Sequence, residues 1–157
     1  MTRHPEKLDR LTEETRAGNE EYVEAVIRET LRLRPVIPFV GRVLQQPQSI
    51  AGYELPAGSR VAPSIHLVHR REDLYPEAAA FRPERWLGVR PNPYTFIPFG
   101  GGVRRCLGAS FAETEMRAVL AAIVSHVRLR PVAAESERIS RRVITLVPSR
   151  GAEVIAA

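Results

Sequence analysis

The single cysteine of the chain, Cys106, follows three glycines and two arginines in the stretch Phe-Gly-Gly-Gly-Val-Arg-Arg-Cys-Leu-Gly, residues 99–108. An apolar helical pattern begins directly after it, and the unpaired amides at a helix N-terminus favour a thiolate. Arg104 and Arg105 add positive charge, and the glycines leave the backbone open to a broad, flat group. Such a sulfur can be a nucleophile, a redox sensor or a metal ligand.

Several roles are open to a lone thiol, and the most frequent is a structural one at a loop–helix junction. Nucleophilic catalysis needs a base, and the four histidines of the chain stand in no recognisable partner pattern. A tetrahedral zinc site needs further histidine, cysteine or carboxylate ligands at regular spacing, which the sequence does not show. One sulfur is sufficient as the axial ligand of a haem, because the porphyrin supplies four other bonds to iron.

Hydrophobic periodicity predicts three helices around this stretch. The first covers residues 5–14, and the second runs from Asn19, a capping residue type, to the residue before Pro35. The third and strongest covers residues 107–127, where apolar side chains recur at helical spacing and alanines fill the gaps. The cysteine therefore precedes the best helix of the chain.

The remaining segments predict small sheets and an irregular region. Residues 36–62 alternate short apolar runs with proline and glycine turns, which is typical of short antiparallel strands. Residues 64–69 favour one or two helical turns, and the proline-rich residues 70–98 favour a long irregular segment that packs through its aromatic side chains. Near the C-terminus, a strand over residues 143–147 is predicted to pair with residues 153–156. The fold class is thus α+β and mainly helical.

Length and composition favour one domain with a sizeable core, because the chain has 157 residues of which 44% are hydrophobic. The net charge is +5, but the arginines are spread along the chain and no nucleic-acid-binding motif occurs, so no nucleic-acid partner is expected. One cysteine excludes an intramolecular disulfide and fits a reducing compartment. With no secretory signal and no apolar run of membrane-spanning length, we predict a cytoplasmic location.

The residues around the cysteine also carry a resemblance to a known family. Phe99, Gly102, Arg104, Cys106 and Gly108 together resemble the haem-binding signature of the cytochrome P450 family, Phe-x-x-Gly-x-Arg-x-Cys-x-Gly. This signature fixes the residue type at five of ten positions, so it is far more specific than a lone cysteine.

Three further stretches follow the order of that family. Residues 29–32, Glu-Thr-Leu-Arg, resemble its Glu-x-x-Arg helix motif, and Pro35 and Arg42 follow at the family's spacing. Residues 81–86, Phe-Arg-Pro-Glu-Arg-Trp, resemble the Pro-Glu-Arg-Phe element of its meander, and residues 69–70 match its frequent His-Arg pair. The Glu-x-x-Arg pattern alone is weak evidence, since such pairs are common on helix surfaces.

The resemblance implies a role for each matched residue. Cys106 would be the proximal thiolate ligand of haem b, iron protoporphyrin IX, and Phe99 would pack against the proximal face. Gly102 and Gly108 would let the haem approach the backbone. Arg104 and Arg42 would pair with the haem propionates, since guanidinium suits carboxylate.

Three other matched residues would act in folding rather than in chemistry. By resemblance, Glu29, Arg32 and Arg85 would form a buried charge network that joins the Glu-x-x-Arg helix to the meander. Removal of one partner would leave uncompensated buried charge. Loss of Glu29 is therefore expected to prevent haem incorporation.

At the level of the whole chain, the resemblance implies that residues 1–157 are the C-terminal portion of a cytochrome P450 domain, with the haem-binding loop at residues 99–108. Small antiparallel sheets, an irregular meander and a long helix after the loop are expected. The N-terminal portion of the family, with the central helix that carries its acid/alcohol pair, is not found in the sequence and is taken to be absent.

The function implied is a haem-thiolate monooxygenase that uses O2 to hydroxylate a small apolar substrate. Its electrons would come from a ferredoxin or a flavoprotein reductase, and a separate N-terminal half is a further possible partner. Two alternatives stay open: a truncated, non-catalytic haem-binding or interaction fragment, and a decayed gene product. Residues 38–40 and the region around Ile144 are the expected pocket edges.

Overall fold

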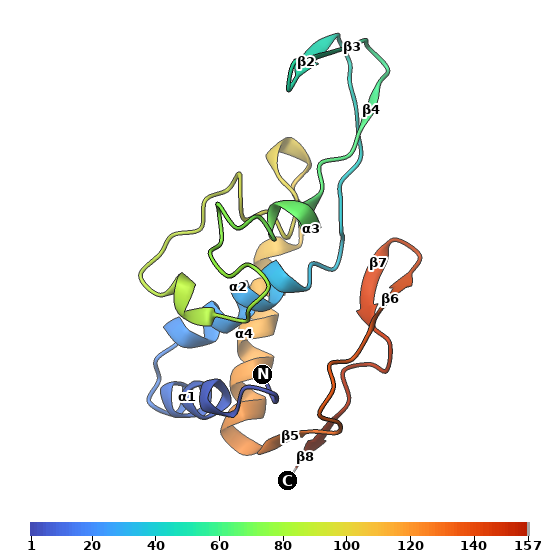
Figure 1. Ribbon diagram of the computed structural model, residues 1–157. Coiled ribbons are helices and arrows are strands. Elements are labelled where there is room, and N and C mark those ends of the chain that lie inside the picture. Colours follow the sequence, from blue (N-terminus) through green and yellow to red (C-terminus); the bar gives the residue numbers. More distant parts are fainter. Residues whose placement is uncertain (157) are drawn as a thin grey trace.

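The computed structural model describes residues 1–156, and within them the helices form a body from which hairpins extend (Figure 1). The body contains α1 (Pro5–Arg16), α2 (Glu21–Leu33) and α4 (Ala109–His126). Each of these helices contacts the other two. None of the helices in the described residues has the length and apolar character that a membrane crossing requires.

The core lies where the apolar stripe of α2 meets its neighbours. Most of α2 is buried, so its inward residues are the centre of the fold. The main core cluster comprises Leu11, Tyr22, Val23, Ala25, Val26, Ile27, Tyr75, Ala78, Trp86 and Val124. The predicted helical stripe after Asn19 is confirmed. The N-cap residue is Glu20 rather than the predicted Asn19, whose side-chain oxygen accepts a hydrogen bond from the Glu21 amide at 3.1 Å.

The helix after the cysteine begins two residues later than the sequence predicts. The first α-helical hydrogen bond of α4, from an amide to the carbonyl four residues earlier, runs from Ala112 to Gly108 at 2.9 Å. The residues before it are used differently, because η2 (Gly102–Arg104) forms a 3-10 turn and the Cys106 amide bonds back to Phe99. Leu107 is consequently fully exposed rather than part of the helix face.

The strands predicted between residues 36 and 62 are present and antiparallel. β1 (Arg42–Val43) pairs with β4 (Arg60–Val61), and between them β2 (Gln48–Ile50) pairs with β3 (Tyr53–Leu55). In Figure 1 these strands form an arm that extends away from the helices.

The irregular segment over residues 70–98 follows the short helix α3 (Ile65–Val68) and contains no strand, as predicted. Its one regular element is η1 (Pro83–Trp86), which contacts α2. The ring of Trp86 lies 4.6 Å from that of Phe96 and 6.0 Å from that of Tyr75. These aromatic contacts hold the segment against the core.

The C-terminal region contains two separate antiparallel pairs. β6 (Ile139–Arg142) pairs with β7 (Thr145–Pro148), and the chain reverses between them at Val143, whose φ is +57°. β8 (Val154–Ala156) pairs instead with β5 (Leu129–Pro131), the strand that directly follows α4.

The predicted hairpin between residues 143–147 and 153–156 is therefore wrong. The turn falls at the start of the segment predicted as a strand, and a β-branched residue occupies the left-handed position there, which residue preferences disfavour. Propensity alone consequently placed the turn between residues 147 and 153 and chose the wrong partner for the last strand.

Candidate functional site

The backbone of residues 99–108, called the cysteine loop below, is closed by three hydrogen bonds. The Gly100 amide donates to the Ile97 carbonyl at 2.9 Å, and the Arg105 amide donates to the Gly102 carbonyl at 3.0 Å. The Cys106 amide donates to the Phe99 carbonyl at 3.0 Å, which joins the two ends of the loop. The cysteine is therefore held by a folded loop rather than a flexible one.

Two glycines of the cysteine loop have a backbone conformation that other residues disfavour. Gly100 has φ +71° and Gly102 has φ +63°. A Cβ at Gly100 would lie 3.6 Å from the side chain of Val40, whereas one at Gly102 would meet no atom within 4 Å. Gly102 is thus required by its backbone angle, and the space beside it is open.

The sulfur of Cys106 is accessible and lies beside the start of α4. The residue is exposed, and a Cβ added to Gly108 would lie 4.0 Å from its sulfur. Among residues 1–156 no three histidine, cysteine or acidic side chains gather as a metal site. The donor set is one sulfur, which fits an iron that a macrocycle already holds and does not fit a bare metal ion.

A cavity of about 690 Å³ lies beside the cysteine loop, within the range typical of ligand pockets. Three of the residues predicted to bind cofactor line it: Arg42, Phe99 and Gly102. Cys106, Arg104 and Gly108 do not line it. The structure therefore groups part of the predicted site around one cavity, and Cys106 is not part of its lining.

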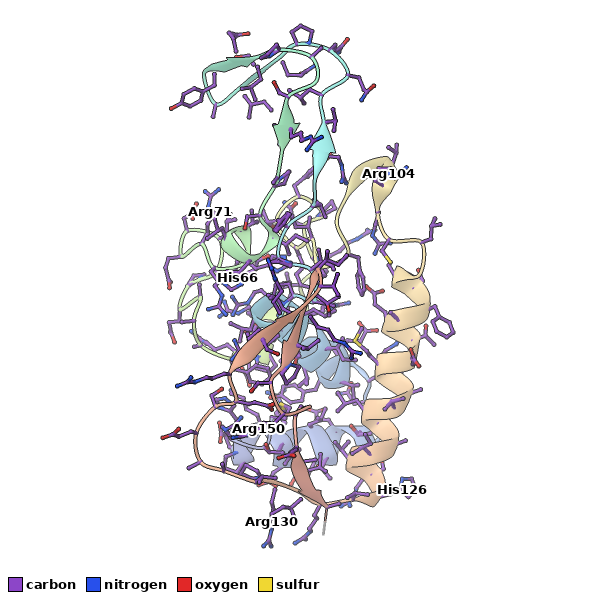
Figure 2. The ribbon with its side chains drawn as sticks, turned by 90° about the vertical axis from the view of Figure 1, so that its right-hand side faces the viewer. His66, Arg71, Arg104, His126, Arg130 and Arg150 are labelled. Carbon is purple, nitrogen blue, oxygen red and sulfur yellow. The ribbon has the colours of Figure 1, made fainter. Side chains whose placement is uncertain are left out.

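The two arginines predicted to bind propionates lie in different settings. Arg42 is on β1, half-buried, and its Nη1 donates to the Gly41 carbonyl at 2.8 Å. Arg104 is exposed, and Figure 2 shows it beyond the end of α4 opposite to His126. Arg105, which the sequence assigned no role, lines the cavity. Two adjacent arginines could not be told apart by residue type.

The wall between α2 and α4 carries charged side chains that the sequence did not single out. Glu24 accepts from Arg117 at 2.8 Å and from Arg28 at 2.7 Å. The Glu24–Arg28 spacing of four residues was a visible helix-surface signal, but its contact with Arg117 depends on how the two helices pack. These side chains line the cavity together with Glu113.

Glu29 and Arg32, both on α2, form a buried bidentate ion pair. The Arg32 Nε and Nη2 atoms each donate to a different Glu29 oxygen at 2.8 Å, and both side chains are fully buried. Arg32 Nη1 also donates to the carbonyl of His69 at 2.6 Å and to that of Ala78 at 2.8 Å. The arginine thus joins α2 to the irregular segment.

The same carboxylate is bound from η1. Arg85 Nε donates to Glu29 Oε1 at 3.2 Å, and the Trp86 indole nitrogen donates to Oε2 at 2.9 Å. Burial by itself raises the pKa of Glu29, but hydrogen bonds from Arg32, the Arg82 amide and Trp86 outweigh it and hold that pKa below its usual value. Glu29, Arg32, Arg85 and Trp86 are called the charge network below.

Trp86 and His69 are functional candidates that residue patterns did not assign. Trp86 was noted only as the last residue of a motif, yet it completes the hydrogen bonding of Glu29. His69 is fully buried, and its Nε2 accepts a hydrogen bond from the Ile97 amide at 2.9 Å. The only signal in the sequence was its place in a His-Arg pair.

Comparisons with known proteins agree with this arrangement. The family model for cytochrome P450 matches residues 1–155. The chain is 45% identical over 160 residues to "Putative cytochrome P450 135B1" of Mycobacterium tuberculosis, covering 98% of this chain and 34% of that protein. It is also 45% identical over 154 residues to "Putative cytochrome P450 137" of the same organism, covering 98% and 32%. The chain thus spans about a third of the length of these relatives.

A solved structure shares the fold. The retinoic acid bound cyanobacterial CYP120A1 superimposes with a TM-score of 0.86 at 24% identity, over 99% of this chain and 40% of that one. The predicted partial P450 fold, with its small antiparallel sheets, is therefore confirmed. Family membership implies a haem cofactor. On its motifs, its fold and these relatives, the chain belongs to the cytochrome P450 family.

Proposed function

We propose that the chain carries the haem-thiolate site of a monooxygenase that hydroxylates a small apolar molecule with O2. The observation that carries the proposal is the accessible sulfur of Cys106, held by a closed glycine loop at the start of α4. Haem b, when bound, would supply the oxygen activation, which a thiolate ligand favours by donating electron density to iron.

The residues beside Cys106 would tune the sulfur. Within the described residues, the amides of Leu107 and Gly108 donate no backbone hydrogen bond, so both are available to a thiolate. Hydrogen bonds from such amides lower the donor strength of a sulfur ligand and thereby set the potential of its metal. Phe99, at the cavity wall, would exclude water from this face.

Arginines would bind the carboxylate groups of the cofactor. Arg42 and Arg105 line the cavity, and Arg104 is exposed next to the cysteine. A guanidinium can donate two parallel hydrogen bonds to one carboxylate. We assign Arg42 and Arg104 to the haem propionates, as the family resemblance implies. We add Arg105 as a third candidate for these carboxylates because it lines the cavity.

Glu29, Arg32 and Arg85 would keep the site folded rather than take part in chemistry. The Glu29–Arg85 ion pair and the hydrogen bond from Arg32 to the Ala78 carbonyl join α2 to the irregular segment that leads into the cysteine loop. We further propose that a ferredoxin or a flavoprotein reductase supplies the electrons, and that the protein acts in the cytoplasm, where its thiol stays reduced.

A second function, a haem-binding or interaction fragment without turnover, is favoured by one observation. Val103, Leu107 and Phe111 are 102%, 104% and 74% exposed, so apolar side chains beside the cysteine have no cover. Such a rim suits contact with another polypeptide, for example a separate N-terminal half. The two proposals differ in turnover and not in haem ligation.

The test is the ferrous carbon monoxide spectrum of the purified chain supplied with haem. Thiolate ligation predicts a strongly red-shifted Soret band, and Cys106→Ser should lose this band. Substrate turnover with a generic reductase then separates the monooxygenase from the fragment without turnover. An unshifted band in the unsubstituted chain would contradict both.

A further inference from the structure

We propose that His69 is a positioning residue for the cysteine loop, because its ring accepts the Ile97 amide and so ties the loop to the charge network. The inference rests on the proposed function only in taking this loop as the haem-binding loop. The contact between the ring and the peptide stands independently of that assignment.

The connection starts in the charge network. Arg32 Nη1 donates to the His69 carbonyl at 2.6 Å, which fixes the backbone of this residue at the end of α3. Arg32 is itself held by Glu29 through two hydrogen bonds of 2.8 Å. The backbone that carries the imidazole is therefore bound to a fully buried ion pair.

The connection continues through the ring into the loop. His69 Nε2 accepts from the Ile97 amide at 2.9 Å, and the Ile97 carbonyl accepts from the Gly100 amide at 2.9 Å. Ile97 is thus held on both sides, two residues before Phe99, whose carbonyl accepts a hydrogen bond from the Cys106 amide. Displacement of Ile97 would move the residues that close the loop.

The ring must be neutral and of one tautomer to do this. A nitrogen that accepts a hydrogen bond carries no proton, so the proton of the neutral ring is on Nδ1. His69 is fully buried, and its Nδ1 has no hydrogen-bond partner within the described residues. A buried donor left without a partner costs free energy. A buried imidazole at this position is explained if the hydrogen bond that its Nε2 accepts from Ile97 is needed.

Packing holds the ring in this orientation. The imidazole stacks on Phe96 with ring centres 5.5 Å apart and an angle of 20°. It meets the edge of Tyr75 at 6.3 Å and 82°. The Tyr75 hydroxyl donates to the Thr95 carbonyl at 3.0 Å, so both aromatic neighbours are tied to the segment just before Ile97. A rotation of the ring would disturb these contacts.

The experiment compares three substitutions in the full chain. His69→Phe keeps the ring shape and removes the acceptor. His69→Gln keeps an acceptor at a similar distance from the backbone, so it is the conservative rescue. His66→Phe is the matched control, because His66 lies on α3, the short helix that His69 follows, and its ring makes no hydrogen bond within the described residues.

The first readout is amide hydrogen exchange over residues 95–106, measured without haem. We expect the Ile97 amide to exchange about tenfold faster in His69→Phe, near the unsubstituted rate in His69→Gln, and unchanged in His66→Phe. Fluorescence of Trp86, the only tryptophan, reports whether the charge network stays folded. Equal Ile97 exchange in His69→Phe and the unsubstituted chain would overturn the proposal.

The second readout is the fraction of added haem that shows the red-shifted carbon monoxide band. It should fall in His69→Phe and recover in His69→Gln while the fluorescence of Trp86 stays unchanged. If the unsubstituted chain shows no such band, the proposed function fails, but the exchange measurement still decides the role of His69.

A third measurement covers the case in which His69→Phe does not fold. Nitrogen-15 NMR of the histidine-labelled, unsubstituted chain at neutral pH reports which ring nitrogen is protonated. The proposal requires a neutral His69 with its proton on Nδ1. A proton on Nε2 would contradict it.

Discussion

The charge network and the cysteine loop are two polar regions of the same small protein, built in opposite ways. In the network, Glu29 and Arg32 are fully buried, and Glu29 accepts hydrogen bonds from α2 and from η1. In the loop, every residue from Gly102 to Gly108 is exposed, and hydrogen bonds run mainly within the loop itself. The charges of the network are thus paired within this chain, whereas the cysteine loop presents an exposed surface.

This difference predicts that the charge network governs the stability of the fold and that the cysteine loop governs ligand binding. Charges removed from water must be paired within the fold, so any change in the network should affect the folding free energy. An exposed thiol exchanges contacts with water at little cost, so its replacement should alter binding and leave stability nearly unchanged. Four predictions follow this contrast, beginning with the largest expected change in stability.

Glu29→Ala should cause the largest effect, a loss of about 3–5 kcal/mol in the free energy of unfolding, because it leaves Arg32 buried and unpaired. It should also prevent haem incorporation. Chemical denaturation followed by Trp86 fluorescence measures the first effect. The control is Glu24→Ala on the same helix, where the ion pairs are partly exposed and the cost should stay near 1 kcal/mol or below. Normal stability and haem content in Glu29→Ala would refute the role of the network.

Acid should cause the second-largest loss of stability, through protonation of His69, which contacts the charge network. Burial, with the nearby Arg32 charge, lowers the pKa of His69 from 6.5 to about 4. On acidification, His69 of the unfolded chain takes up a proton at a higher pH than His69 of the folded chain does. The contribution of neutral His69 to the free energy of unfolding is therefore complete above pH 6.5 and is lost as the pH falls toward 4. Its upper limit is about 3 kcal/mol.

Denaturation curves across this pH range measure that loss. His66 and His4 also have a lowered pKa, but both are partly exposed and should contribute less. His69→Gln should therefore remove most of the dependence of the free energy of unfolding on pH in this range. Because the pKa of Glu29 is lowered, protonation of Glu29 adds a further loss of stability only at lower pH. An unchanged slope in His69→Gln would show that the titration lies elsewhere.

Gly102→Ala should have an intermediate effect, about 1–2 kcal/mol, because its φ of +63° is strained for a residue with a side chain. No atom lies within 4 Å of the added Cβ, so the cost is that of the backbone alone. Gly101→Ala is the control, since φ is −155° there and its Cβ also meets open space. Thermal unfolding of the two variants gives the comparison. Equal melting temperatures would contradict it.

Cys106→Ser should have the smallest effect on stability, below about 0.5 kcal/mol, because the thiol is exposed. The same variant should lose thiolate-type haem binding completely. Denaturation and the carbon monoxide spectrum, run on one preparation, test both parts. A large loss of stability would mean that the cysteine is structural.

The sequence predicted most of this arrangement where a local pattern carries the information. Helical periodicity located α1, α2 and α4 within two residues at most ends, and motif spacing identified Glu29, Arg32 and Arg85 before their contacts were known. Turn and proline signals also indicated the strands before α3 and the irregular segment after it.

Contacts that depend on tertiary packing were not predictable in this way. The pairing of β5 with β8 joins segments about 25 residues apart, and the tight reversal at Val143 uses a residue that seldom adopts positive φ. The roles of Trp86 and His69 depend on which buried partner each ring meets. The signature singled out Arg104, and only the folded loop shows that Arg105 lines the cavity whereas Arg104 does not.

X-ray absorption at the iron edge of the haem-loaded chain tests the central claim most directly, since it reports the atoms bonded to iron. We predict one sulfur bonded to iron in the unsubstituted chain and none in Cys106→Ser. Iron bonded only to nitrogen and oxygen in the unsubstituted chain would contradict the account.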